Sequence, residues 1–132
     1  MAYPDQEKAH LLIADDDPDF AESVKDILER EGYSVWIAKN GRQAVDRVRG
    51  DGIQLLILDM GMPVLNGLYV CLELKASGHI LPTIIVTAYT DEESGALKLL
   101  KSMPTTRIMY KPFNPKVLLA EVRALLEARE EV

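Results

Sequence analysis

The sequence is poor in the residues that support disulfide or thiol chemistry. Its only cysteine is Cys71, and its two histidines are His10 and His79. One thiol cannot close an internal disulfide, and no Cys–His signature accompanies it, so a catalytic cysteine is not indicated. Cys71 lies in an apolar stretch and is expected to pack as a small hydrophobic side chain.

Long apolar runs and basic clusters are also missing. No hydrophobic stretch approaches the roughly 20 residues that span a bilayer, and the first ten residues, MAYPDQEKAH, do not resemble a signal peptide. We therefore expect a soluble, cytoplasmic protein without a membrane partner. The formal net charge of −6 argues against direct binding to nucleic acid or to an anionic membrane, because both require a positive field.

Glycine-rich nucleotide loops are absent as well, since neither G-x-G-x-x-G nor G-x-x-x-x-G-K-[ST] occurs. What the chain does contain is typical of one globular domain. It has 132 residues, of which 48% are hydrophobic and 27% are charged.

Short apolar runs alternate with stretches of helical periodicity. Predicted strands cover residues 11–14, 35–38, 53–58, 82–87 and 108–110. Predicted helices run from Pro18 to Gly32, after Asn40-Gly41, over 68–77, from Asp91 to about Ser102, and from Asn114-Pro115 to about Leu126. This alternation predicts an α/β fold in which a parallel sheet is doubly wound by helices. The nearly continuous apolar strands fit a sheet that is covered on both faces.

Polar side chains stand at the carboxyl ends of four predicted strands. They are Asp15, Asp16 and Asp17 after the first strand, Asp59 after the third, Thr87 at the end of the fourth and Lys111 after the fifth. In open parallel sheets, functional sites lie beyond the carboxyl ends of the strands. The sequence therefore predicts that carboxylates, one hydroxyl and one ammonium converge on one edge.

Each member of this group has a specific chemical use. Crowded carboxylates repel one another, and an oxygen-only donor set of high charge suits Mg²⁺. A lysine ammonium can neutralise a phosphoryl oxygen, and a threonine hydroxyl can donate a further hydrogen bond. An aspartate can itself act as a nucleophile. Together these groups are suited to phosphoryl transfer onto a carboxylate.

Structural interpretations compete with this one. They are a strand-ending turn for Asp59, helix capping for Asp15 and Asp16, a β-branched strand residue for Thr87, and a solvated surface charge for Lys111. Asp17, just before Pro18, can cap the first helix by itself, which leaves the two preceding acids unexplained. Convergence of several strand ends favours the functional interpretation.

The segments LLIADDDPDF, LLILDMGMPVLNG, TIIVTA and YKPF resemble, in this order, the motifs of response regulator receiver domains. The resemblance covers about residues 9–128 and leaves short tails at 1–8 and 129–132. It implies a flavodoxin-like (βα)5 fold with strand order 2-1-3-4-5.

The resemblance also implies a role for each matching position. Asp59 would be the phosphoacceptor, and Mg²⁺ would be held by Asp15, Asp16, Asp59 and the backbone carbonyl of Gly61, with Asp16 the closer of the acidic pair. Thr87 and Lys111 would contact the phosphoryl oxygens. The Lys111-Pro112 bond would be cis, as is usual in the family.

A phosphorylation-dependent signalling switch is the implied function. A histidine kinase or phosphotransfer protein would phosphorylate Asp59, and the altered surface would meet a downstream protein or output domain. The chain would catalyse its own phosphoryl transfer and slow dephosphorylation without being an enzyme in the ordinary sense. The alternative is an interaction module whose output does not depend on phosphorylation. An aspartyl phosphatase is disfavoured, because Gly61 stands where such enzymes carry a second aspartate.

Two departures from the family pattern concern the output. Many receivers carry an aromatic residue where this chain has Ile108, and Tyr110 lies on the same side of the predicted strand. The segment 102–106 replaces the usual Gly-Ala turn. The chain ends soon after Leu126, so it is either a stand-alone protein or part of a longer regulator or hybrid kinase, and a homodimer is left open.

Overall fold

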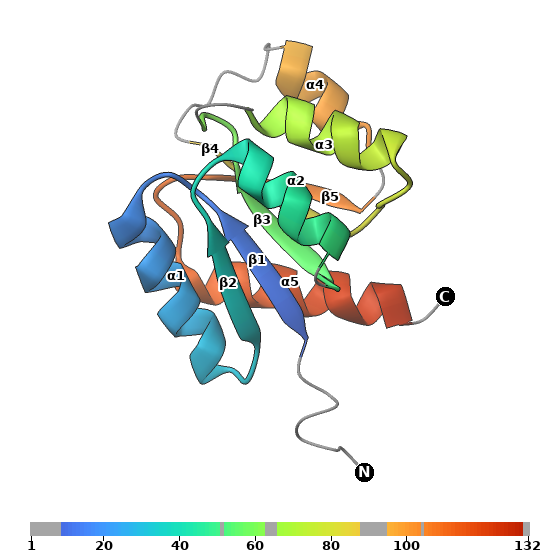
Figure 1. Ribbon diagram of the computed structural model, residues 1–132. Coiled ribbons are helices and arrows are strands. Elements are labelled where there is room, and N and C mark those ends of the chain that lie inside the picture. Colours follow the sequence, from blue (N-terminus) through green and yellow to red (C-terminus); the bar gives the residue numbers. More distant parts are fainter. Residues whose placement is uncertain (1–8, 51, 63–65, 88–94, 104, 131–132) are drawn as a thin grey trace.

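The computed structural model describes residues 9–50, 52–62, 66–87, 95–103 and 105–130 (Figure 1). The strands are β1 His10–Ala14, β2 Ser34–Ala38, β3 Leu55–Asp59, β4 Thr83–Thr87 and β5 Thr106–Tyr110. The helices are α1 Pro18–Arg30, α2 Gly41–Gly50, α3 Gly67–Ala76, α4 Gly95–Lys101 and α5 Pro115–Glu130. Strands and helices alternate along the chain, as the sequence predicts.

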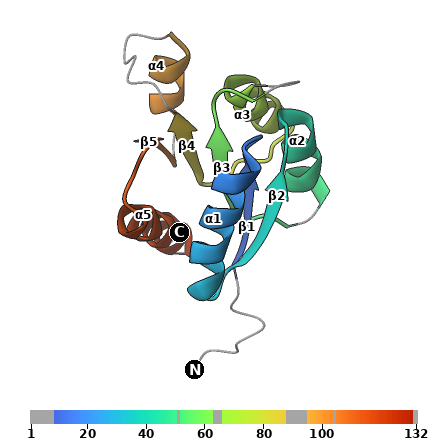
Figure 2. The ribbon, with the colours of Figure 1, turned by 90° about the vertical axis from the view of Figure 1, so that its left-hand side faces the viewer.

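All strands are parallel, and their order across the sheet is β2-β1-β3-β4-β5. This is the doubly wound, flavodoxin-like arrangement that the resemblance implied. Helices α1 and α5 cover one face of the sheet, whereas α2 and α3 cover the other (Figure 2). The strand order changes direction between β1 and β3, because the chain moves from β1 to one edge of the sheet and from β3 to the other. A crevice at the carboxyl edge is expected at this point.

Alternate strand residues point into two separate hydrophobic cores. On β1, Leu11 and Ile13 pack with α1 and α5 in the first core, whereas Leu12 and Ala14 pack with α2 and α3 in the second. This alternation follows from the pleat of the strand, which turns successive side chains to opposite faces. Both faces are apolar because helices cover both, as the continuous apolar runs predict.

The first turn of α1 is organised as the sequence predicts. Asp17 is the N-cap, and its side chain accepts hydrogen bonds from the amides of Asp19 and Phe20, at 3.1 Å and 3.3 Å. Pro18 occupies the first helical position, where its missing N–H has no cost. The helix ends before Gly32, whose φ of +96° is a left-handed conformation that glycine adopts readily.

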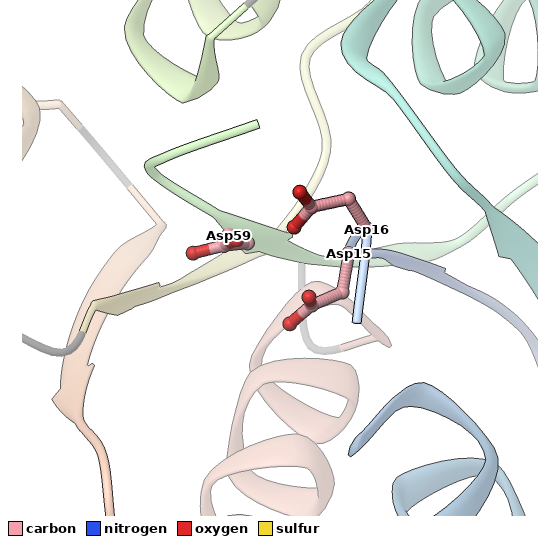
Figure 3. Close-up of side chains that lie close together, drawn as sticks. All are labelled: Asp15, Asp16 and Asp59. Carbon is pink, nitrogen blue, oxygen red and sulfur yellow. The ribbon is translucent and has the colours of Figure 1, made fainter. Parts of the chain in front are cut away.

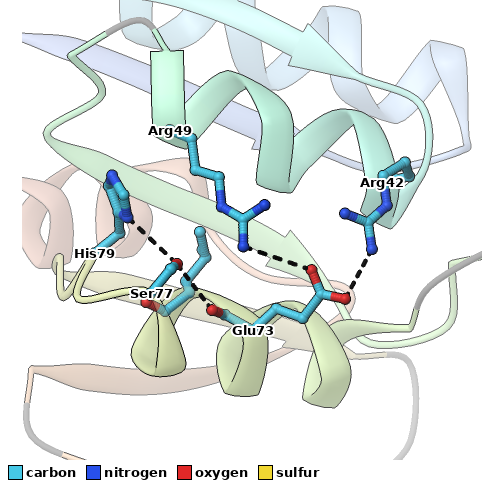
Figure 4. Close-up of polar contacts among 6 residues, drawn as sticks. Arg42, Arg49, Glu73, Ser77 and His79 are labelled. Atoms are coloured by element: carbon cyan, nitrogen blue, oxygen red, sulfur yellow. Dashed lines mark hydrogen bonds and ion pairs between the residues drawn. The ribbon is translucent and has the colours of Figure 1, made fainter.

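Helices α2 and α3 are joined on their outer side by charged groups (Figure 4). The Glu73 carboxylate lies 2.7 Å from the Arg42 guanidinium and 4.0 Å from that of Arg49. At the end of α3, the Ser77 hydroxyl lies 3.3 Å from Nδ1 of His79. Exposed pairs of this kind contribute little to stability individually.

Some element boundaries differ from the predicted ones. Strand β5 begins at Thr106 rather than at residue 108, because the polar Thr106 and Arg107 still pair with β4. Arg107 reaches the Glu121 carboxylate on α5, at 3.2 Å, which explains a charged residue within a strand. Strand β3 begins at Leu55 rather than at residue 53. The predicted acidic first turn at residues 91–93 lies outside the described residues.

Two isolated side chains have packing roles. Trp36 stacks on His10 with ring centroids 5.1 Å apart and packs against the second core. Cys71 is partly buried against the second core, and burial raises the pKa of its thiol to about 11. Within the described ranges, no helix is long and apolar enough to cross a membrane.

Candidate functional site

The register of the sheet brings the predicted polar residues to one edge. Ala14 of β1 pairs with Leu58 of β3, so Asp15 and Asp59 each follow a paired residue on neighbouring strands. Thr87 of β4 pairs with Tyr110 of β5, and the Lys111 amide donates a 2.8 Å hydrogen bond to the Thr87 carbonyl. Ladder hydrogen bonds therefore set the spacing of these positions.

Three carboxylates form a compact cluster at this edge (Figure 3). Asp15, Asp16 and Asp59 each place one carboxylate oxygen within 4.8 Å of the other two. Asp15 is buried, Asp59 is partly buried, and Asp16 is exposed. The prediction that these acids lie close together is confirmed. Oxygen donors of this charge and spacing fit a hard divalent cation such as Mg²⁺.

A cleft beside α1 reaches two of the three acids. A cleft of about 210 Å³ lies next to the cluster. Its lining residues are Asp15, Asp16, Pro18, Ala21, Glu22, Ile37 and Lys39. Because two members of the cluster line this cleft, a small hydrated ion can approach them from solvent.

Asp15 has a partner for each of its carboxylate oxygens. One oxygen accepts a 3.1 Å hydrogen bond from the Lys111 ammonium, and the other accepts a 2.9 Å bond from the Asp17 amide. The ammonium also lies 4.0 Å from the centre of the Phe20 ring. Lys111 is therefore a partly buried cation directed at the acidic cluster, not a solvated surface charge.

Asp59 lies in an environment that opposes its ionisation. Burial is the main cause that raises its pKa above the ordinary 3.8, and the charge of Asp15 acts in the same direction. The amide of Gly61, which donates to the Asp59 carboxylate at 3.4 Å, and the charge of Lys111 act against this shift. A raised pKa with these causes is typical of functional carboxylates.

The segment after Asp59 packs closely on the start of α3. A Cβ atom on Gly67 would lie 3.0 Å from Cα of Met60 and 3.1 Å from the carbonyl oxygen of Asp59. The Gly67 amide donates to the Met60 carbonyl at 3.2 Å, and Asn66 caps the helix through the Tyr69 amide. Sequence reasoning identified Asn66-Gly67 only as a loop, because the close approach depends on tertiary contacts.

The remaining predicted positions also lie at this edge. Thr87 is buried at the end of β4, and Gly61 is exposed two residues beyond Asp59. The peptide bond between Lys111 and Pro112 is cis, as the resemblance implied. Sequence reasoning missed Phe20, because nothing in the local sequence indicates that its ring contacts the Lys111 ammonium.

Comparisons with known proteins agree with this architecture. Residues 11–123 match the family model described as response regulator receiver domain. The chain is 37% identical over 127 residues to the DNA-binding response regulator MtrA of Mycolicibacterium smegmatis, covering 96% of this chain and 54% of that protein. It is 39% identical over 116 residues to the response regulator MprA of Mycolicibacterium vanbaalenii, covering 88% and 49%. The chain thus spans about half the length of these curated relatives.

Solved structures show the same fold. The signal receiver domain of a signal transduction histidine kinase from Syntrophus aciditrophicus superposes with a TM-score of 0.81 at 31% identity, covering 91% of each chain. A CheY-like receiver domain protein from Methanospirillum hungatei gives a TM-score of 0.82 at 27% identity, covering 95% of this chain and 98% of the other.

Proposed function

This chain belongs to the response regulator receiver domain family, and from that premise we propose that it is a phosphorylation-dependent switch of a two-component system. The observation that carries the proposal is the cluster itself. Asp15, Asp16 and Asp59 meet within 4.8 Å, and the Lys111 ammonium lies 3.1 Å from Asp15. The mutual repulsion of three clustered carboxylates is relieved only by positive charge, and a divalent cation together with Lys111 would supply it and leave the site able to accept a phosphoryl group.

We further propose that Asp15, Asp16, Asp59 and the backbone carbonyl of Gly61 hold Mg²⁺. Bound there, Mg²⁺ would neutralise charge on the phosphoryl oxygens. The donor set contains oxygen alone, which suits Mg²⁺ and is poor for zinc, whose usual ligands are nitrogen and sulfur. Asp16 is the most exposed of the three acids and would be the first to meet the ion from solvent.

The transfer step would be a direct displacement at phosphorus. A carboxylate oxygen of Asp59 attacks the phosphorus of a phosphohistidine on a histidine kinase or phosphotransfer protein. A bond forms between that oxygen and phosphorus, the P–N bond breaks, and its electron pair returns to the ring, which carries a proton on its other nitrogen and leaves as neutral imidazole. The Lys111 ammonium and the Thr87 hydroxyl donate to the phosphoryl oxygens as charge develops there.

Dephosphorylation would reverse the switch within the same site. A water molecule attacks phosphorus, the bond to the Asp59 oxygen breaks, and inorganic phosphate leaves as the carboxylate is restored. The chain would thus catalyse its own phosphorylation and slow hydrolysis, with no separate substrate turned over. This is the sense in which it is a signalling protein and not a conventional enzyme.

Output would depend on how the phosphoryl group alters the β4–α5 side of the molecule. A dianion on Asp59 would draw the Thr87 hydroxyl inward and bias two conformations of this side. The downstream partner would be another protein or an output domain, and MtrA is described as DNA-binding. With a net charge of −6, the chain described here is not proposed to bind nucleic acid directly.

One observation favours a second function, an interaction module that works without phosphorylation. Ile108, at the position where many receivers carry an aromatic residue, packs against the second core. The aromatic neighbour on the same side of β5 is Tyr110, whose buried hydroxyl has no hydrogen-bond partner among the described residues. If Tyr110 does not respond to the phosphoryl group, the usual aromatic link to the output surface is missing.

The proposal is tested by exposing the chain to acetyl phosphate and Mg²⁺ and measuring its intact mass. We expect the native chain to gain one phosphoryl group and Asp59→Asn to gain none. Asp19→Asn, which removes an exposed acid outside the cluster, is the matched control and should gain the group normally. No gain in the native chain, or an equal gain in Asp59→Asn, would overturn the proposal.

A further inference from the structure

We propose that Phe20 is a positioning residue for Lys111, and that its aromatic face holds the ammonium against the acidic cluster. The inference rests on the proposed function, in which Lys111 meets the phosphoryl group on Asp59. It goes beyond that function by assigning a role to a side chain of α1 that carries no polar group.

The contact between ring and ammonium has cation–π geometry. Nζ of Lys111 lies 4.0 Å from the centre of the Phe20 ring and 3.1 Å from Oδ2 of Asp15. The negative face of an aromatic ring attracts a cation within about 6 Å, and the attraction strengthens when the cation is partly removed from water. The Lys111 side chain is only 23% exposed, so this condition is met.

The ring is itself held in place from a second direction. Phe113 packs edge-on against Phe20, with centroids 5.8 Å apart and an interplanar angle of 87°. Phe113 follows Lys111 after Pro112, so the start of the β5–α5 connection contacts the same ring twice. Edge-to-face pairs of this geometry are favourable.

The contacts close into a circuit of four residues, Asp15, Asp17, Phe20 and Lys111. Asp15 accepts a hydrogen bond from the Asp17 amide, and the Asp17 side chain accepts one from the Phe20 amide. The Phe20 ring contacts the Lys111 ammonium, which returns to Asp15. The first turn of α1 and the position of the ammonium are therefore linked to a single buried carboxylate.

The circuit limits where the ammonium can point. A lysine ammonium has three N–H donors and a flexible stem, and here Asp15 accepts from one of them. The ring occupies another side without offering an oxygen that would compete for the remaining donors. A phosphoryl group on Asp59 would thus meet a cation whose orientation is already restricted, which favours the transfer step.

The competing explanation is that Phe20 only fills the first core, against which it packs. Aliphatic and aromatic replacements separate the two explanations. Phe20→Leu and Phe20→Met keep an apolar side chain of similar volume and remove the ring, whereas Phe20→Tyr keeps the ring. Two aliphatic variants are used so that a folding defect in one does not decide the result.

The first measurement needs neither metal nor phosphoryl donor. In NMR spectra of the full chain, the ε-methylene protons of Lys111 are assigned by their loss in Lys111→Met. We expect them upfield of ordinary lysine values in the native chain and in Phe20→Tyr, and at ordinary values in Phe20→Leu and Phe20→Met. Ordinary values in the native chain would overturn the proposed contact.

The second measurement is the rate of phosphorylation by acetyl phosphate with Mg²⁺. We expect Phe20→Leu and Phe20→Met to be slower than the native chain by about three- to tenfold, and Phe20→Tyr to remain within about twofold. Native rates in both aliphatic variants, or an equal loss in Phe20→Tyr, would overturn the positioning role. If the native chain takes up no phosphoryl group, the proposed function fails, while the NMR result still decides whether Phe20 holds Lys111.

Discussion

Among single residues, Asp59 is subject to opposing influences. Burial and the charge of Asp15 raise the pKa of its carboxyl group, whereas the Gly61 amide and Lys111 lower it, and the net shift is upward from 3.8. Ionisation of Asp59 therefore costs folding free energy. The cost is absent below the unfolded-state pKa and fully present above the folded-state pKa.

The upward shift of the Asp59 pKa leads to a prediction for Asp59→Asn. Without divalent cations, the variant should have a higher free energy of unfolding than the native chain at pH 7, because it never ionises. The advantage should shrink as the pH falls through the interval between the raised pKa and 3.8. Urea unfolding across this pH range is the measurement. A difference that grows on acidification would contradict the assigned direction.

Metal binding leads to a second prediction at this scale. A ligand at one hundred times its Kd adds about 2.7 kcal/mol to the stability of the state that binds it. We expect saturating Mg²⁺ to raise the Tm of the native chain and to have little effect on Asp16→Asn, which loses one cluster carboxylate. Asp19→Asn removes the same charge from the adjacent exposed turn and should respond as the native chain does. If the Mg²⁺-induced rise in Tm were reduced equally in both variants, the effect of Mg²⁺ would be nonspecific charge screening.

At the scale of elements, the start of α1 depends on one side chain. Asp17 accepts hydrogen bonds from the Asp19 and Phe20 amides. Loss of such an N-cap costs about 1 kcal/mol, so Asp17→Ala should lower the free energy of unfolding by about this amount, with an unchanged urea m-value. Asp19→Ala, in the same turn but without the capping role, should lose less. A larger loss in Asp19→Ala would show that helix-dipole effects dominate.

The start of α3 leads to a prediction about close packing. A side chain at Gly67 would meet the backbone of Met60 and Asp59 at 3.0–3.1 Å, and backbone atoms cannot move aside cheaply. Gly67→Ala should cost about 1–3 kcal/mol and weaken Mg²⁺-dependent stabilisation, because Asp59 would shift. Gly95→Ala is the control, since a Cβ there has open space. Chemical denaturation with and without Mg²⁺ measures both effects.

The elements also show where sequence reasoning succeeds and where it does not. The apolar runs located every strand, and Asp17-Pro18 and Gly32 marked both ends of α1. The start of β5 was placed too late, because Thr106 and Arg107 are polar and their pairing with β4 is a tertiary effect. The contact of Phe20 with Lys111 was missed for a similar reason, since periodicity identifies a buried face and not the group it meets.

For the whole molecule, the strands of one sheet contribute side chains to both cores. Because neither core can lose these strands without the other, we predict cooperative unfolding. Ile57 of β3 lies in the first core, whereas Trp36 packs against the second. Ile57→Ala should cost about 2–5 kcal/mol, and its unfolding curves by Trp36 fluorescence and by far-UV circular dichroism should coincide. Leu56→Ala, on the opposite face, is the matched variant and should behave alike. Separate transitions would show that the cores unfold independently.

The position of Trp36 determines what its fluorescence can report. A magnesium titration followed by Trp36 fluorescence would be informative only if the ring sensed the acidic cluster. The ring stacks instead on His10, the first residue of β1, whereas Asp15 follows the last residue of that strand. Trp36 is thus expected to report on folding more directly than on occupation of the acidic cluster.

For the whole molecule, most of the sheet architecture and the location of the acidic cluster could be predicted from the amino-acid sequence. Strict alternation of strands and helices indicated a parallel, doubly wound sheet, and strand-end polarity indicated the edge that holds the acids. The strand order came from the family resemblance, because alternation alone does not determine which strands are neighbours. The burial of Lys111 and its pairing with Asp15 required the folded structure, since the sequence placed this lysine at the acidic edge without indicating which carboxylate it contacts.

The ladder that places Asp15, Asp59, Thr87 and Lys111 has a broader consequence. Their spacing is inherited from main-chain pairing between neighbouring strands, so it owes nothing to the solvent-facing sides of α2, α3 and α5. Those sides can change their charge and shape without disturbing the acids. The chemistry of the acidic edge and the shape of the outer helix surfaces are thus encoded by different residues. Substitutions on those surfaces alone can therefore change which partner the fold binds.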